Sequence, residues 1–482
     1  MITKSFIKSS IIYTMAGALP MANAVLLLPF YLHYLPAQDF GALALYLSFS
    51  IVVQIIVTYS FDASLYLYFH DFKRDPQKLA VLVSSSFTFI VLLGIAVSVI
   101  LWATGGVLFH YFFGGRGLDF YPYGVFSVVT AVFQSVFKVN NSLLQSREKP
   151  VLFLWSNLLS FLLVAGFTIA GLKVFPNTLM GPVGGRMLAF VISGLWVLAR
   201  IYKEFGIHFN LSLLRTTFAY NSYQCIYQLQ QWVINYFDRI LIAAIISMTD
   251  LGVYDFTIKC LLVLDFVISG IFNSFFPKIL SHSSDQALAG SSIEINRYYH
   301  GLTAAIMIMV SGTILVLPVL ITVLVKKPGY SESVDFVPYA SLVFLLRGMK
   351  FFFGLPYNTM KHSKPLPVIF MIVAVGKVAV SYLLIKQFGI YGAIAATVMA
   401  AGGEVVLLWL WMRAKFAYFF NPLKLIIGPL LLMVTVLVSE PLLHFSFPWQ
   451  AHLGYVLLTC LLLVWLYRKE IVLLDIRKIL RS

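Results

Sequence analysis

Apolar residues occur along this chain in long continuous runs, which short polar connections separate. Each run approaches or exceeds the roughly 20 residues that an α-helix needs to cross a bilayer. The runs do not show the alternation of a transmembrane β-barrel, and a helix satisfies its own backbone hydrogen bonds in lipid. The pattern therefore predicts fourteen membrane-spanning helices, over residues 9–34, 41–67, 79–104, 120–144, 151–172, 178–199, 216–248, 250–276, 299–325, 334–360, 366–385, 389–412, 422–439 and 450–467.

Composition agrees with this pattern, because 60% of the 482 residues are hydrophobic and only 11% are charged. So little polar material could not cover the surface of a soluble protein of this length. The first run is too long for a removable signal peptide and lacks a small-residue cleavage site, so we expect it to stay as an anchor. The three cysteines lie inside predicted spans without paired spacing, which indicates packing residues rather than disulfides or metal ligands.

The distribution of lysine and arginine predicts the orientation. If both termini are cytoplasmic, 22 of the 34 basic residues fall in cytoplasmic loops and the tail, and five fall in outer loops. Cationic loops resist translocation, so this alternation supports an even number of spans with both termini inside. These cytoplasmic basic residues account for most of the net charge of +15. Their contact with anionic membrane lipids explains this charge, so we expect no nucleic-acid partner.

Three short markers recur in order with a period near 213 residues. Asp39-Phe40-Gly41 returns as Asp250-Leu251-Gly252 at an offset of 211, the Lys149-Pro150 pair returns at 215, and Leu172-Lys173-Val174-Phe175 returns as Ile385-Lys386-Gln387-Phe388 at 213. Six helices per repeat predict two lobes that a pseudo-twofold axis along the membrane normal relates. We expect a six-helix lobe at 1–212, a second at 213–418, and two added helices with a basic cytoplasmic tail at 419–482.

The twelve-plus-two layout and two segments carry a resemblance to a known family. The segments are residues 34–41 (YLPAQDFG) and residues 235–242 (NYFDRILI), which continue to 250–254 (DLGVY). The chain resembles the bacterial polysaccharide flippases, or O-antigen transporters, of the superfamily that also contains the MATE multidrug exporters and the lipid II flippases. The resemblance implies an all-α protein of the bacterial inner membrane, which moves an undecaprenyl-diphosphate-linked oligosaccharide to the outer leaflet by alternating access. Other membrane proteins of polysaccharide assembly are further candidate partners.

Charged residues inside the predicted spans are the first candidates for function. A charge in hydrocarbon costs about 2.5 to 3.5 kcal/mol on insertion scales, so each needs a partner, a water-filled cavity or an interface. Arg347 and Lys350 are spaced i, i+3 on one helix face near mid-bilayer, and could meet a diphosphate. The alternative is a buried network with Asp265 and Glu404. The predicted cationic substrate residues are Arg347, Lys350, Lys377, Arg239, Lys259, Lys138 and Arg186.

Amide side chains form two rows at helical spacing, one in the fourth span and one in the seventh. Such rows cannot face lipid cheaply, and they suit either sugar hydroxyls or hydrogen bonds between helices. The predicted polar cavity lining consists of Gln224, Gln228, Gln231, Asn235, Gln134, Asn141 and, beside the Arg347 stripe, Asn358.

The sequence contains no phosphate-binding loop and no soluble segment long enough for an ATPase, which predicts a facilitator or an ion-coupled transporter without cofactor or metal. Asp265, Glu404 and Asp62 are the candidates for ion coupling, and the membrane potential is the alternative. Lipid II flipping and drug export stay open as other transport functions. A polymerase or acyltransferase should show a catalytic outer loop, and the longest outer segment, near 105–119, has no catalytic spacing.

Overall fold

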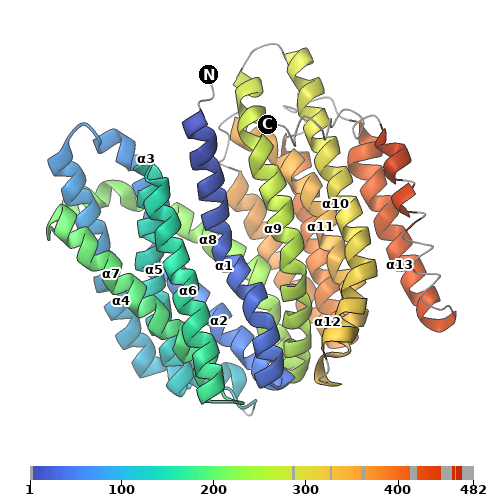
Figure 1. Ribbon diagram of the computed structural model, residues 1–482, viewed down its shortest axis with the longest axis horizontal. Coiled ribbons are helices and arrows are strands. Elements are labelled where there is room, and N and C mark those ends of the chain that lie inside the picture. Colours follow the sequence, from blue (N-terminus) through green and yellow to red (C-terminus); the bar gives the residue numbers. More distant parts are fainter. Residues whose placement is uncertain are drawn as a thin grey trace. The chain divides into compact units, whose positions relative to one another are not determined.

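The computed structural model describes residues 4–114, 116–284, 288–325, 328–359, 365–412, 421–446, 457, 459–461 and 463–468. Within them the chain is helical and contains no strand, and it forms two compact units, Met1–Asp255 and Phe256–Ser482 (Figure 1). Nine helices in this part of the chain are long and apolar enough to cross a membrane. The prediction of an all-α membrane protein is therefore confirmed.

The first unit follows the predicted spans closely, with one break. Its helices are α1 (Lys4–Tyr34), α2 (Ala37–Thr58), α3 (Phe61–Phe72), α4 (Pro76–Phe113), η1 (Phe120–Gly124), α5 (Val125–Ser146), α6 (Pro150–Val174), η2 (Met180–Gly184), α7 (Gly185–Phe205), α8 (Leu211–Ile245) and the start of α9 (Met248–Ser284). Within this unit α5 contacts α2, α3 and α7, and α1 runs along α6. Helix α4 continues to Phe113, so most of the segment expected as the longest outer loop is helical.

The prediction of one continuous span over 41–67 is wrong. Tyr59 and Ser60 both adopt positive φ angles, 43° and 54°, which end α2 and start α3 in a new direction. Residues other than glycine rarely adopt this left-handed conformation, and neither glycine nor proline marks the break in the sequence. The side chain of Ser60 is fully buried, so tertiary contacts hold the turn.

Two of the recurring segments touch each other inside the first unit. Gly41 and Gly252 are each the fifth residue of their helix, α2 and α9. A Cβ on Gly41 would lie 2.0 Å from the Met248 carbonyl oxygen, and one on Gly252 would lie 1.9 Å from that of Ala37. Gly41 and Gly252, and likewise Ala37 and Met248, differ by the same offset of 211, so the contact is symmetric between the two repeat segments. Only glycine allows the two backbones to approach this closely.

The second unit contains the remainder of α9 and the later helices: α10 (Leu288–Leu324), η3 (Pro328–Tyr330), α11 (Ser333–Thr359), α12 (Leu366–Met412), η4 (Leu423–Ile427) and α13 (Gly428–Ser446). Helix α11 packs against both α10 and α12. Gly389, with φ 59° and ψ −133°, divides α12 at the point where the sequence predicts a connection between two spans. The described residues from 457 to 466 are helical and belong to the fourteenth predicted span.

Some sequence predictions about boundaries stay predictions. The division between the compact units falls after Asp255, whereas the boundary expected from the repeat lies at 212/213. The second Lys-Pro marker begins in 361–364, and these residues lie outside the described part of the chain, as does the basic tail from 469 to 482.

Candidate functional site

The structure pairs three of the predicted cations with the three acids expected to couple ions. In the first unit the ammonium of Lys138 in α5 lies 3.0 Å from a carboxylate oxygen of Asp62 in α3. In the second unit Arg347 in α11 forms an ion pair with Asp265 in α9, and Lys350 Nζ lies 2.6 Å from Glu404 Oε1 in α12. The last two pairs match the alternative interpretation of Arg347 and Lys350, in which the two acids hold them.

The two members of each pair differ in exposure. The side chains of Lys138, Arg347 and Lys350 are 35%, 33% and 37% exposed, while their acidic partners are 17%, 16% and 4% exposed. The carboxylates therefore lie behind the cations. Each pair leaves its positive member the more accessible to a solute.

The Lys138 site depends on the break between α2 and α3. Lys138 also donates to the amide oxygen of Gln228 in α8 at 2.8 Å, and Gln228 donates in turn to Ser60 Oγ at 3.0 Å. Ser60 occupies the left-handed turn, and Asp62 follows it in the first turn of α3. The break thus brings an acid, a base and an amide from three helices to one site. Sequence reasoning found Asp62, Lys138 and Gln228 but missed Ser60.

Arg239 lies in a closed network near the end of α8 and the start of α9. Its guanidinium Nε donates to Asp255 Oδ1 at 2.8 Å, and Nη1 donates to the Asn235 carbonyl at 2.8 Å and lies 3.3 Å from Asp238 Oδ1. Tyr254 donates to the other Asp238 oxygen at 2.5 Å. The Arg239 side chain is only 8% exposed. This geometry fits a structural role in joining the two helices.

Arg186 in α7 lies among aromatic side chains. Its guanidinium lies 5.3 Å from the centre of the Phe190 ring, and the phenols of Tyr31 and Tyr236 are its titratable neighbours. Among the described residues no carboxylate pairs with it, and its Nε has no hydrogen-bond partner. A half-buried guanidinium in this state is a candidate for an anion.

Aromatic rings border the two pairs of the second unit. The Arg347 guanidinium lies 5.6 Å from the centre of the Phe351 ring, which stacks on Phe272 at 4.0 Å, and Lys350 lies 5.7 Å from the Phe370 ring. Of the remaining predicted cations, Lys377 in α12 is buried at 3% exposure, and Lys259 in α9 is half-buried.

The amide rows are only partly brought together. Asn141 donates to Asn157 of α6 at 3.0 Å, so it joins two helices, while Gln224 reaches Tyr220 on its own helix at 3.4 Å. Asn235 donates to the Gln231 carbonyl one turn earlier, at 2.7 Å. Gln134 is half-buried in α5. The side chain of Asn358 lies outside the described part of the structure.

No group of three or more histidine, cysteine, aspartate or glutamate side chains in the described ranges has the arrangement of a metal site.

Comparison with known proteins identifies the family. The model of the polysaccharide biosynthesis protein family matches residues 6–283, which is more than half of the chain. The chain belongs to this family. Protein 1 of the Lsg locus of Haemophilus influenzae is 22% identical over 280 residues, or 56% of this chain and 65% of that protein. A Shigella flexneri protein named "Putative O-antigen transporter" is 22% identical over 270 residues, 53% of this chain and 62% of the relative. The chain thus spans less than two thirds of each of these relatives.

Solved structures show the same fold. The lipid II flippase MurJ, in an inward closed conformation, matches with a TM-score of 0.68 at 14% identity, over 96% of this chain and all of the other. An inward-facing MATE family multidrug transporter matches with a TM-score of 0.66 at 12% identity, over 84% of this chain and 98% of the other. The resemblance inferred from the sequence is confirmed in family and in fold.

Proposed function

We propose that this protein is a flippase of the bacterial inner membrane, with both termini in the cytoplasm. Its cargo is an undecaprenyl-diphosphate-linked oligosaccharide, which it carries by alternating access from the cytoplasmic to the outer leaflet for surface polysaccharide synthesis. The observation that supports this cargo best is the exposure of the cations in the Lys138, Arg347 and Lys350 pairs, on a transporter fold in a polysaccharide biosynthesis family.

A diphosphate can use such pairs because it competes with the carboxylate for the same cation. Arg347 offers a planar fork to phosphate oxygens, and Lys350 one turn away offers a compact positive charge. The acid behind each cation neutralises it while the site is empty, which lowers the cost of holding a charge in the membrane. When the cargo leaves, the carboxylate takes its place again. Binding of this kind is reversible, as transport requires.

Drug export is the less favoured function on this fold. A cationic drug would need an accessible carboxylate, and in these pairs the accessible member is the base. Lipid II flipping would use the same diphosphate chemistry, so the choice between the two glycolipids depends on the sugar.

The proposal is tested by translocation of a fluorescent undecaprenyl-diphosphate oligosaccharide in proteoliposomes. Replacing both Arg347 and Lys350 by alanine should lower the rate at least about tenfold, because each charge-assisted hydrogen bond contributes about 1.5 to 3 kcal/mol. Asp265→Asn should keep or raise cargo binding, because it frees Arg347. The matched control is Arg147→Ala, which removes a basic residue of the first unit that pairs with Glu204 and is not among the predicted cargo residues.

The outcomes separate cargo binding from structure. Loss of transport in the Arg347/Lys350 variant with normal thermal unfolding supports a cationic cargo site. If Asp265→Asn and Arg347→Ala impair transport equally and both unfold at lower temperature, the pair is structural. If the intact protein moves no lipid-linked oligosaccharide, the proposed function is wrong.

A further inference from the structure

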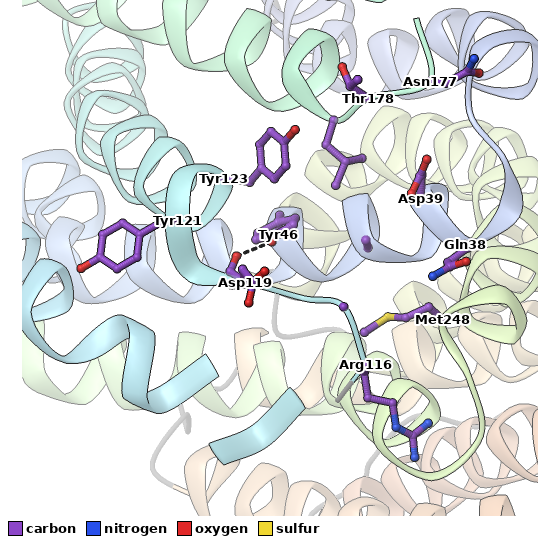
Figure 2. Close-up of a pocket in the computed structure, with 13 residues that line it drawn as sticks. Gln38, Asp39, Tyr46, Arg116, Asp119, Tyr121, Tyr123, Asn177, Thr178 and Met248 are labelled. Atoms are coloured by element: carbon purple, nitrogen blue, oxygen red, sulfur yellow. Dashed lines mark hydrogen bonds between the residues drawn. The ribbon is translucent and has the colours of Figure 1, made fainter. Parts of the chain in front are cut away.

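A polar pocket of about 250 Å³ lies inside the first unit, where α2 begins and where the connections before η1 and η2 run (Figure 2). Asp39 comes from the first turn of α2, Asp119 and Tyr123 from the segment around η1, and Asn177 from the connection between α6 and η2. The distribution of lysine and arginine predicts that this end of the unit lies on the outer side of the membrane. None of the residues predicted for the cargo site lines it.

Several polar side chains of this pocket bond to backbone carbonyls, but within the described ranges its carboxylates and amides do not take part in such contacts. Among the described residues no ion pair involves the carboxylates of Asp39 and Asp119, and no hydrogen bond uses the side-chain amides of Gln38 and Asn177. The wall itself is fixed, because the buried Tyr46 hydroxyl donates to the backbone carbonyl of Asp119 at 2.5 Å. The pocket therefore offers free acceptors and donors on a held framework.

The one basic residue of the lining does not neutralise these carboxylates. In Figure 2 the Arg116 guanidinium points away from Asp39 and Asp119. It donates instead to two backbone carbonyls at the end of α8. One belongs to Ala244 in the last turn, at 2.5 Å, and the other to Ile246 directly after the helix, at 2.8 Å. Its charge is thus placed at the negative end of a helix dipole. The groups that remain in the pocket favour a neutral ligand with many hydroxyls over an anion.

We propose that this pocket binds one neutral sugar ring. The Tyr123 ring, which extends toward Thr178 in Figure 2, offers an aromatic surface for the apolar face of a pyranose. Carboxylates accept strong hydrogen bonds from hydroxyls, and amides both donate and accept. The pocket is smaller than the roughly 300 to 1,000 Å³ of sites for drug-sized ligands, so it fits a single ring rather than a whole oligosaccharide.

In the flippase this ring would belong to the glycan that has reached the outer side, and to that extent the inference rests on the proposed function. The pocket would then select the glycan by its sugar, whereas the cations of the ion pairs recognise the diphosphate. Acidic sugars should bind worst, because two carboxylates repel them. Helix-end stabilisation explains only part of the arrangement. Asp39 lies in the first turn of α2, and Asp119 is the N-cap residue of η1, but its side chain makes no capping hydrogen bond.

Saturation-transfer NMR on the full-length protein in nanodiscs tests this inference without transport. The probes are the methyl glycosides of glucose, N-acetylglucosamine and glucuronic acid. We expect saturation transfer to at least one of the two neutral glycosides and little to the glucuronide. Asp119→Ala should lower the bound fraction about tenfold, because it removes a hydrogen bond to a charged group. Tyr123→Ala should lower it severalfold. The matched control is Tyr111→Ala, an exposed ring at the end of α4 outside the pocket.

Each variant is checked by thermal unfolding, and Asp119→Ala keeps the backbone carbonyl that holds Tyr46. The inference is overturned if no glycoside shows saturation transfer, if the pocket variants bind as the intact protein does, or if Tyr111→Ala loses binding equally. It is also overturned if sodium ions, and no glycoside, stabilise the protein through Asp39. Glycoside binding without transport of the lipid-linked oligosaccharide would support the sugar pocket and refute the proposed function. Transport without glycoside binding would support the proposed function and refute the sugar pocket.

Discussion

The contact between Gly41 and Gly252 gives a sharp prediction about packing. In Gly252→Ala the new Cβ would lie 1.9 Å from the Ala37 carbonyl oxygen and 2.7 Å from its carbon. Both atoms are backbone, so no side chain can rotate away. Ordinary contact begins at 3.4 Å, which means that the two helix ends must separate by about 1.5 Å. Overpacking of this kind costs about 1 to 3 kcal/mol.

Helix propensity raises the stability of a glycine-to-alanine variant, and a control variant measures this gain without the clash. Alanine is favoured over glycine by about 1 kcal/mol in a helix interior. Gly166 in α6 is also helical, and nothing lies within 4 Å of a Cβ placed there. Gly166→Ala should therefore raise stability or leave it unchanged. The difference between the two variants, about 1 to 3 kcal/mol, isolates the clash.

The symmetry of the contact predicts how the two substitutions combine. Once Gly252→Ala has separated α2 from α9, the Cβ of Gly41→Ala meets a more distant Met248 carbonyl. The double variant should thus lose less stability than the sum of the two single losses, as coupled neighbours do. Thermal unfolding in one detergent, followed by loss of the monodisperse peak in size-exclusion chromatography, measures all four proteins. If Gly252→Ala unfolds at the same temperature as Gly166→Ala, or if the two single losses simply add, the close contact between α2 and α9 does not limit stability.

Three further predictions concern charged groups. Arg239→Met should destabilise by about 3 to 5 kcal/mol, because it leaves Asp255 and a second carboxylate buried without their cation, and chemical denaturation in micelles measures the loss. Lys138→Met should cost less, about 1 to 2 kcal/mol, since its partner Asp62 is partly exposed, and adding Asp62→Asn should restore part of the loss in a double-mutant cycle. Asp75 caps α4 by accepting a hydrogen bond from the backbone N–H of the third helical residue, and this bond lowers the pKa of its carboxyl. The resulting stabilisation is complete above the unfolded-state pKa and is lost as pH falls through the lower folded-state pKa. Asp75→Asn should therefore flatten the acid side of a profile of stability against pH.

Much of the fold followed from hydropathy and local signals, because lipid leaves the backbone few choices. The division of α12 at Gly389 was predictable from a polar connection and a glycine that adopts positive φ. The break at Tyr59 and Ser60 was not, because neither residue type favours it and the contact of Ser60 with Gln228 in α8 supports it. That contact joins residues 168 positions apart.

The residue types of the candidate site were predictable, and the acids that pair with Arg347 and Lys350 were predicted as one of two alternatives. The i, i+3 spacing placed Arg347 and Lys350 on one face, but their partners come from α9 and α12, whose rotation about their axes no local pattern fixes. The polar pocket of the first unit was missed for a related reason. Its walls come largely from short connections, none of which carries a recognisable motif by itself. Only the fold brings Asp39 and Asp119 to one cavity.

The most direct test of the central claim is a two-cargo measurement in one preparation of proteoliposomes that contain the intact protein. Translocation of the undecaprenyl-diphosphate oligosaccharide is followed beside that of a fluorescent cationic dye. A flippase for lipid-linked oligosaccharides should move the oligosaccharide faster than it crosses protein-free liposomes, and should not move the dye. Transport of the dye without the oligosaccharide would show that the protein is a drug exporter and not such a flippase.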